Sequence, residues 1–206
     1  MVNNHAGQKM ASSLEAYIDQ SIEDMKNDQF IAEADPTGKA LERTLSVLRA
    51  AKERGELSSY DYENAWSGYK QCMLDRGYKE IILTKLPNGL YKEAGHRGGT
   101  PEQETRYSND NTDCMAMHVF GIDGVYQVQV GNPNLYRNSF EAIIDCFHRS
   151  NIAPKTYSTD DLKHDLFDAR TPDEMIVNRE SPDAQACFVA NNMNVASNND
   201  PLEELW

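Results

Sequence analysis

Hydrophobic residues in the first third of the chain recur at steps of three and four residues, the spacing that places them on one face of an α-helix. Three such series predict three amphipathic helices, over residues 12–27, 35–55 and 58–77. Each series begins with serine, or with aspartate followed by proline, and these residues favour helix starts. Glycine ends the second and third series, as is common at helix C-termini.

The pattern changes after residue 78. Apolar residues on either side of the turn Pro87-Asn88-Gly89 predict a short β-hairpin over residues 80–92. Residues 97–108 are rich in Gly, Pro and Glu and lack an apolar period, so we expect a loop there. Residues 114–130 are ambiguous. Their apolar positions fit a helix, but Gly121 and Gly124 disfavour one, and the stretch 125–130 alternates as a strand does. Helix is the preferred interpretation.

The last third again contains helix signals. Asn138 or Ser139 starts a predicted helix that ends near Asn151, and Ser181 followed by proline starts another that reaches residue 193. Two shorter helices are predicted to start at residues 159 and 171, and the first of them is expected to bury Leu162, Leu166 and Phe167. The whole pattern predicts a mainly α-helical fold of six to eight helices with one small β-hairpin. The alternative is an α+β fold.

This pattern favours a single helical domain over residues 11–195, with N-terminal helices in 11–57 and a core in 58–195. Residues 1–10 are polar and are expected to form a disordered leader, and residues 196–206 form a tail. Three apolar residues end that tail: Leu202, Leu205 and Trp206. They either fold back onto the core or form an exposed docking peptide.

The four cysteines fall in two similar stretches. Each stretch has an aromatic residue six positions before a cysteine, Trp66 before Cys72 and Phe140 before Cys146. A second cysteine follows 42 residues later in one case (Cys114) and 41 later in the other (Cys187). Four cysteines allow three connectivities, and this repeat favours the pairs 72–114 and 146–187. The alternative is four free thiols in a cytosolic protein. Metal binding is disfavoured because no C-x-x-C pair occurs.

Charge limits the possible partners. The formal net charge is -13. Residues 160–206 carry eleven acids against three bases and so account for -8 of it. An acidic surface repels nucleic acid and anionic lipid, and we therefore expect neither as a partner. No apolar run approaches the ~18 residues of a membrane span.

Candidate catalytic groups are weak, and we predict no catalytic residue, metal site or cofactor. Cys146 and His148 stand two positions apart and would point about 200° apart on a helix. The five histidines lack metal-binding spacing, and residues 109–120 lack the glycine and glutamate of a calcium loop. The paired acids stand in acidic runs, which is typical of solvated faces.

The stretch Tyr69-Lys-Gln-Cys72-Met73-Leu-Asp-Arg-Gly77-Tyr78 resembles a motif of uncharacterised secreted or lipid-anchored cell-envelope proteins of Gram-positive, actinobacterial-type bacteria. The Asp113-Cys114 pair, the Asn132-Pro133 pair and the two later cysteines resemble the rest of that pattern, which covers residues 60–193. The second copy departs from it, with Phe147 and Asn151 in place of Met and Gly. The resemblance implies a two-disulfide helical domain outside the cytoplasm and no particular reaction.

These observations predict a binding module of the bacterial cell envelope, extracellular or at the cell surface, with a protein or an envelope component as partner. This location assumes that a targeting segment has been removed. The first alternative is a hydrolase that acts on envelope polymers through acidic residues. The second is a cytosolic regulatory protein with free thiols. The sequence predicts no oligomeric state.

Overall fold

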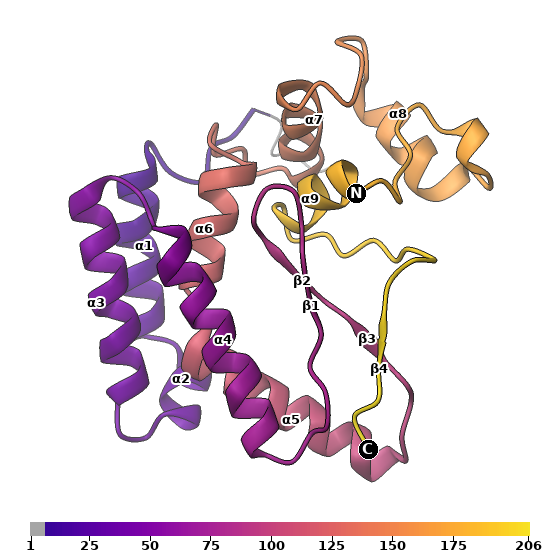
Figure 1. The fold of residues 1–206 in the computed structure, drawn as a ribbon. Helices are drawn as coiled ribbons and strands as arrows, with labels where there is room; N and C mark the ends of the chain where they lie inside the picture. The colour runs from indigo at the N-terminus through magenta and orange to yellow at the C-terminus, as the bar shows by residue number, and fades with distance from the viewer. Residues whose placement is uncertain (1–6) are drawn as a thin grey trace. The chain divides into compact units, whose positions relative to one another are not determined.

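The computed structural model describes residues 7–206, so the first six residues of the predicted leader lie outside the described residues. Between residues 7 and 206 the chain forms nine α-helices and two small two-stranded sheets, which confirms the mainly helical fold (Figure 1). The helices are α1 (Leu14–Lys26), α2 (Gln29–Ala34), α3 (Lys39–Arg54), α4 (Ser59–Asp75), α5 (Pro101–His118), α6 (Ile122–Gly131), α7 (Ser139–Arg149), α8 (Thr159–Lys163) and α9 (Pro182–Val189). The strands are β1 (Leu83–Lys85), β2 (Tyr91–Glu93), β3 (Gly95–His96) and β4 (Leu202–Glu203).

The chain divides into two compact units, each made of three separate stretches of sequence. Within the described residues, unit 1 comprises residues 7–13, 85–92 and 127–200. Unit 2 comprises residues 14–84, 93–126 and 201–206. Helix α6 and the β1–β2 hairpin contribute residues to both units.

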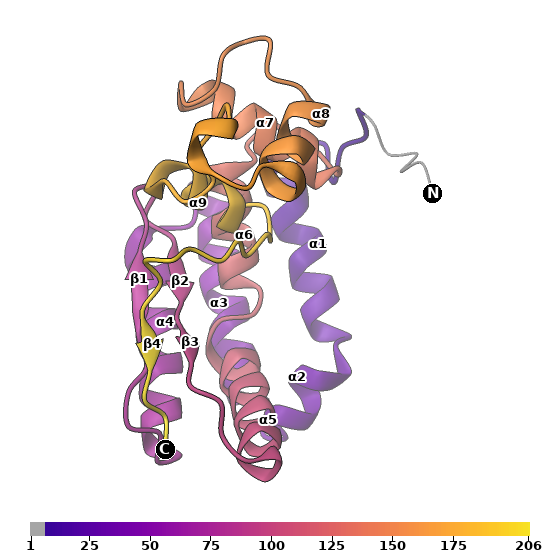
Figure 2. The same cartoon turned by 90° about the vertical axis from the view of Figure 1, so that its right-hand side faces the viewer.

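Unit 2 is a helical bundle in which α4 packs along α5, α1 packs along α3, and α2 contacts α5 (Figure 1). Its interior is rich in aromatic side chains. The rings of Tyr62 and Tyr126 stack with centroids 4.3 Å apart, and Trp66 meets Tyr69 edge-on at 5.5 Å. The last residues return to this unit, where β4 runs parallel to β3 (Figure 2).

Unit 1 encloses a second core between α7, α8 and α9, which includes the buried side chains Ile143, Phe147, Tyr157, Leu162 and Phe188. Lys92 on the hairpin is also buried, with 7% of its side chain exposed. Its ammonium group donates hydrogen bonds to Gln185 (2.8 Å) and to Asp200 (2.7 Å). Met10 lies in this unit as well, and its amide donates to the carbonyl of Leu135 (2.8 Å). These contacts hold the segments around Met10 and Asp200 to the unit.

The structure differs from the sequence predictions at three helix starts. At residue 171 it forms only a 3-10 turn, Pro172–Glu174, in place of the predicted short helix. The loop predicted over residues 97–108 is wrong from Pro101 onward, because α5 begins there. Thr100 and Gln103 form a capping box with proline at the first helical position, and this local signal outweighs the polar composition. The helix predicted from Asp35 begins only at Lys39. The Asp35 carboxylate caps it across a turn and accepts hydrogen bonds from the amides of Ala40 and Leu41.

The ambiguous stretch 114–130 is helical, and the strand alternative is wrong. Gly121 has a φ of +81° and separates α5 from α6, so it lies between the two helices. Glycine adopts this left-handed conformation without the clash that a side chain causes. The short helix α2 went unpredicted, although Asp28 caps it with bonds to the amides of Phe30 and Ile31.

Candidate functional site

Both predicted disulfides are present. Cys72 of α4 is bonded to Cys114 of α5, and Cys146 of α7 is bonded to Cys187 of α9. In the loop-entropy model, closing loops of this length stabilises each unit by about 4 kcal/mol. All four cysteines are therefore oxidised, and Cys146 cannot act as a nucleophile beside His148.

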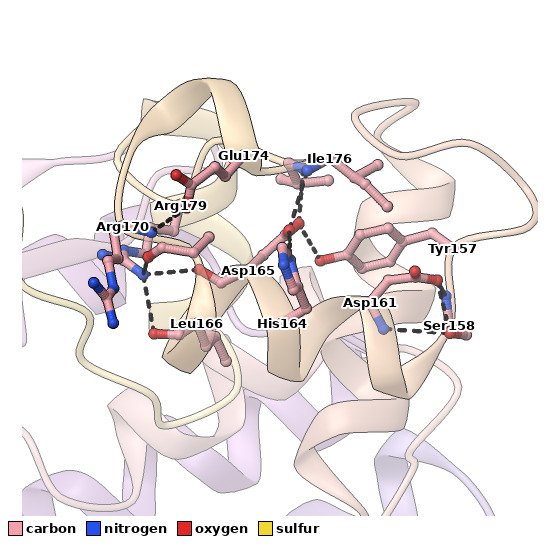
Figure 3. Close-up of polar contacts among 12 residues, drawn as sticks. Tyr157, Ser158, Asp161, His164, Asp165, Leu166, Arg170, Glu174, Ile176 and Arg179 are labelled. Carbon is pink, nitrogen blue, oxygen red and sulfur yellow. Dashed lines mark hydrogen bonds and ion pairs between the residues drawn. The ribbon is translucent and has the colours of Figure 1, made fainter.

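A buried carboxylate organises the acidic segment over residues 157–180, which we call the clasped segment (Figure 3). Asp165 is 2% exposed and lies in a π-helical turn, His164–Asp168, that continues α8. Its carboxylate accepts a hydrogen bond from the hydroxyl of Tyr157 (2.9 Å). It also accepts bonds from the amides of Ile176 (3.0 Å) and Val177 (2.8 Å). Such a set of donors is what stabilises a charged group inside a protein.

Two further observations show how tightly this segment is held. Burial, and after it the hydrogen bond to Asp165, raises the pKa of the Tyr157 phenol above its ordinary value. The phenol therefore stays protonated and acts as a hydrogen-bond donor. Arg179 donates to the carbonyls of Asp165 (2.8 Å) and Leu166 (3.0 Å), where the helical carbonyls would otherwise lack partners. In the view of Figure 3, Tyr157 and Arg179 approach the turn from opposite sides.

The clasped segment presents large apolar side chains to solvent. Phe167 is 71% exposed and Ile176 is 52% exposed. The prediction that Phe167 is buried is wrong. Leu162 is buried and Leu166 packs partly against the core, but Phe167 follows Leu162 by five residues, and on a regular helix that step turns about 140° away from the buried face. The segment carries seven acids and three bases, hence a net charge of -4. The acids at positions 160, 168, 173 and 174 are exposed. Apolar and acidic side chains therefore share this surface.

The residues of the predicted docking tail take different positions in unit 2. Leu205 is buried at 2% exposure, whereas Leu202 is 60% exposed. The Trp206 indole donates a hydrogen bond to the carbonyl of Arg97 (3.1 Å), and its ring lies 6.1 Å from that of Tyr78. The tail thus contacts the unit through Leu205 and Trp206.

Unit 2 also contains acids that are wholly or partly buried. Glu203 belongs to a pair of acids, 203 and 204, that the sequence analysis assigned to a solvated face, and this is wrong for Glu203, which is 2% exposed. Glu93 and Asp123 are partly buried, and the sequence analysis did not single them out. Burial raises the pKa of Glu203 to about 7, and the negative charges of Glu93 and Glu80 act in the same direction. Burial likewise raises the pKa of Asp123 to about 6, against a hydrogen bond from the Trp66 indole. Burial raises the pKa of Glu93 too, although the Tyr69 hydroxyl donates to it at 2.7 Å. The one local signal was the position of Glu203 in the apolar end of the chain.

Within residues 7–206, no group of three or more His, Cys, Asp or Glu side chains is placed to hold a metal ion. In that same part of the chain, no helix is both long and apolar enough to cross a bilayer. No protein-family model matches the chain, and neither a curated protein nor a solved structure shows a significant match to it.

Proposed function

We propose that this protein is a binding module of the bacterial cell envelope that works outside the cytoplasm and recognises a basic partner through the clasped segment. The two disulfides support a location outside the cytoplasm, because such bonds persist in oxidising compartments and are rare in the cytosol. The sequence resemblance around Cys72 points to the same location.

The observation that carries the binding role is the exposure of Phe167 and Ile176 on a segment that is otherwise firmly held. Asp165 and Arg179 hold the backbone on both sides of the turn, so little conformational entropy is lost when a partner binds. Aromatic residues are enriched at the centres of interfaces, and the surrounding acids favour cationic partners. The surface therefore fits a basic segment that carries apolar side chains.

The proposed extracytoplasmic localisation is tested by the redox state of the cysteines in protein taken from the cells that make it. Protein isolated from those cells is alkylated with and without prior reduction, and its intact mass is measured. We expect no alkylation without reduction and four modified cysteines after it. Four cysteines that react without reduction would overturn the extracytoplasmic address.

The recognition surface is tested with an amphipathic peptide of lysine and leucine and with the same peptide carrying glutamate for lysine. We expect the basic peptide alone to bind, and salt to weaken the binding. Phe167→Ser should reduce this binding, whereas Phe30→Ser, at a side chain of similar exposure (67% against 71%) in unit 2, should not. Equal effects of the two variants would refute the assignment of this surface.

The hydrolase alternative is less well supported. A raised pKa near neutrality, like that of Glu203, is what a general acid needs. Glu203 is only 2% exposed, however, and its carboxylate accepts a hydrogen bond from the amide of Ile82. An acid in this position cannot contact a polymer, so we do not propose a catalytic role for it.

A further inference from the structure

A pocket of about 260 Å³ in unit 2 differs in charge from the rest of this acidic protein. It lies where α4 ends, beside the first turns of α5 and the returning tail. Its lining includes three cations and two aromatic rings and no acid: Arg76, Lys79, Arg106, Tyr78 and Trp206. We propose that this pocket binds a small organic carboxylate, with the charged group at the arginines and an apolar body against Tyr78 and Trp206.

The two arginines of the pocket, Arg76 and Arg106, both contact the carboxylate of Asp110, which lies outside the lining. Asp110 accepts a hydrogen bond from Arg76 (2.5 Å) and another from the Tyr78 hydroxyl (2.8 Å). Burial acts to raise the pKa of Asp110, but these hydrogen bonds outweigh it and the pKa is lowered, so the carboxylate stays ionised. Arg76 also contacts Asp113 (3.1 Å). Two acids therefore face Arg76 from α5, outside the lining of the pocket.

Arg106 is the cation best placed to meet a ligand. Its side chain is 66% exposed, and one of its terminal nitrogens is anchored on the carbonyl of Arg76 (2.7 Å). Its weaker contact with Asp110 (3.3 Å) leaves the guanidinium able to turn toward a second carboxylate. Lys79 is less available, because it donates to the backbone oxygen of Trp206.

The aromatic side of the pocket is built to take an apolar body. The Tyr78 and Trp206 rings lie 6.1 Å apart at an angle of 63°, and the Arg106 guanidinium lies 5.8 Å from the Tyr78 ring centroid. Planar guanidinium groups pair with carboxylates and stack on rings at the same time, as a ring-bearing acid requires. The volume suits a ligand smaller than a typical drug molecule.

Phenylacetate is the probe, and its uncharged analogue phenylacetamide is the control ligand. The two indole N–H signals of the protein are followed by NMR, since Trp206 lines the pocket while Trp66 is buried elsewhere in unit 2. We expect phenylacetate to shift the Trp206 signal with a Kd on the order of 1 mM, and phenylacetamide to leave it unchanged. The Trp66 signal should stay in place and reports an intact fold. Equal shifts with both ligands, or none with phenylacetate up to about 20 mM, would overturn the proposal.

Two variants and a peptide sharpen the test. Arg106→Gln should weaken phenylacetate binding about ten-fold, whereas Arg49→Gln, at a 50% exposed arginine of α3, should not change it. An unchanged affinity in Arg106→Gln would contradict the proposal.

The carboxylate can belong to a free acid or to the end of a polypeptide. A short peptide ending in phenylalanine is therefore compared with its amidated form. Tighter binding of the free peptide than of phenylacetate assigns the pocket to polypeptide ends, and weaker binding assigns it to small acids.

Discussion

Replacing Glu203 by glutamine should make the protein more stable at pH 8 and leave its stability nearly unchanged below pH 4.5. Burial raises the pKa of this carboxyl from 4.5 to about 7, while the amide of Ile82 and the charge of His96 lower it. Glutamine is uncharged at every pH and keeps an oxygen that can accept the Ile82 hydrogen bond. It therefore imitates the protonated carboxyl.

The direction of this pH effect follows from the pH at which the Glu203 carboxyl ionises in the unfolded and in the folded protein. Below pH 4.5 the carboxyl is protonated in the folded and the unfolded protein, and its full contribution to stability is present. Between pH 4.5 and 7 only the unfolded state releases the proton, so the folded state loses stability as pH rises. The difference between these pKa values corresponds to about 3 kcal/mol in the free energy of unfolding at pH 8.

Urea unfolding at pH 4 and pH 8, followed by tryptophan fluorescence, measures this difference. Glu204→Gln is the matched control, because the neighbouring side chain is 62% exposed and pairs with Arg97 at the surface. We expect Glu203→Gln to gain stability over the native protein only at pH 8. A gain of the same size at both pH values, or at neither, would refute the assignment of the buried charge to Glu203.

Three further predictions concern buried contacts. Lys92→Met should lower the free energy of unfolding by about 2–4 kcal/mol in urea titrations, because it leaves the partly buried carboxylate of Asp200 without its cation. A loss below about 1 kcal/mol would contradict this. Gly131→Ala should lower the free energy of unfolding by about 1–3 kcal/mol, since the added Cβ would lie 2.0 Å from the Cβ of Ala190. Gly124→Ala in the same helix should raise the free energy of unfolding by up to about 1 kcal/mol. The reverse order of Tm values would contradict this. Asp165→Asn should speed hydrogen exchange at the amides of Ile176 and Val177, which donate hydrogen bonds to this carboxylate. Unchanged exchange would refute the role of Asp165 in holding the segment.

Local signals in the sequence predicted much of the fold. Ser58, Asn138 and Ser181 cap α4, α7 and α9 as expected, because a capping side chain bonds to amides only two or three residues away. The same kind of signal at Thr100 was available, but the polar composition of the following residues obscured it. The cysteine pairing could be predicted because the two stretches around Cys72 and Cys146 repeat one spacing.

The candidate sites could not be predicted, because they depend on contacts that no local pattern records. The bond between Arg76 and Asp110 joins residues 34 positions apart, and it places a cation at a pocket that composition alone would not indicate. The carboxylate of Asp165 likewise accepts hydrogen bonds from Tyr157 and Val177, which stand 8 and 12 residues away, and no helical period records such contacts.

Acids that look alike in the sequence have different roles because burial separates them. Asp160 and Asp165 stand in one acidic run, yet the side chain of the first is 94% exposed and that of the second is 2% exposed. An exposed carboxylate acts on a partner through a field that salt screens, so losing one such charge weakens association and leaves the fold intact. The buried carboxylate acts on the backbone that it holds, so its loss releases the segment on which the exposed acids stand. Neutralising the exposed acids should therefore abolish the salt dependence of peptide binding while preserving the fold.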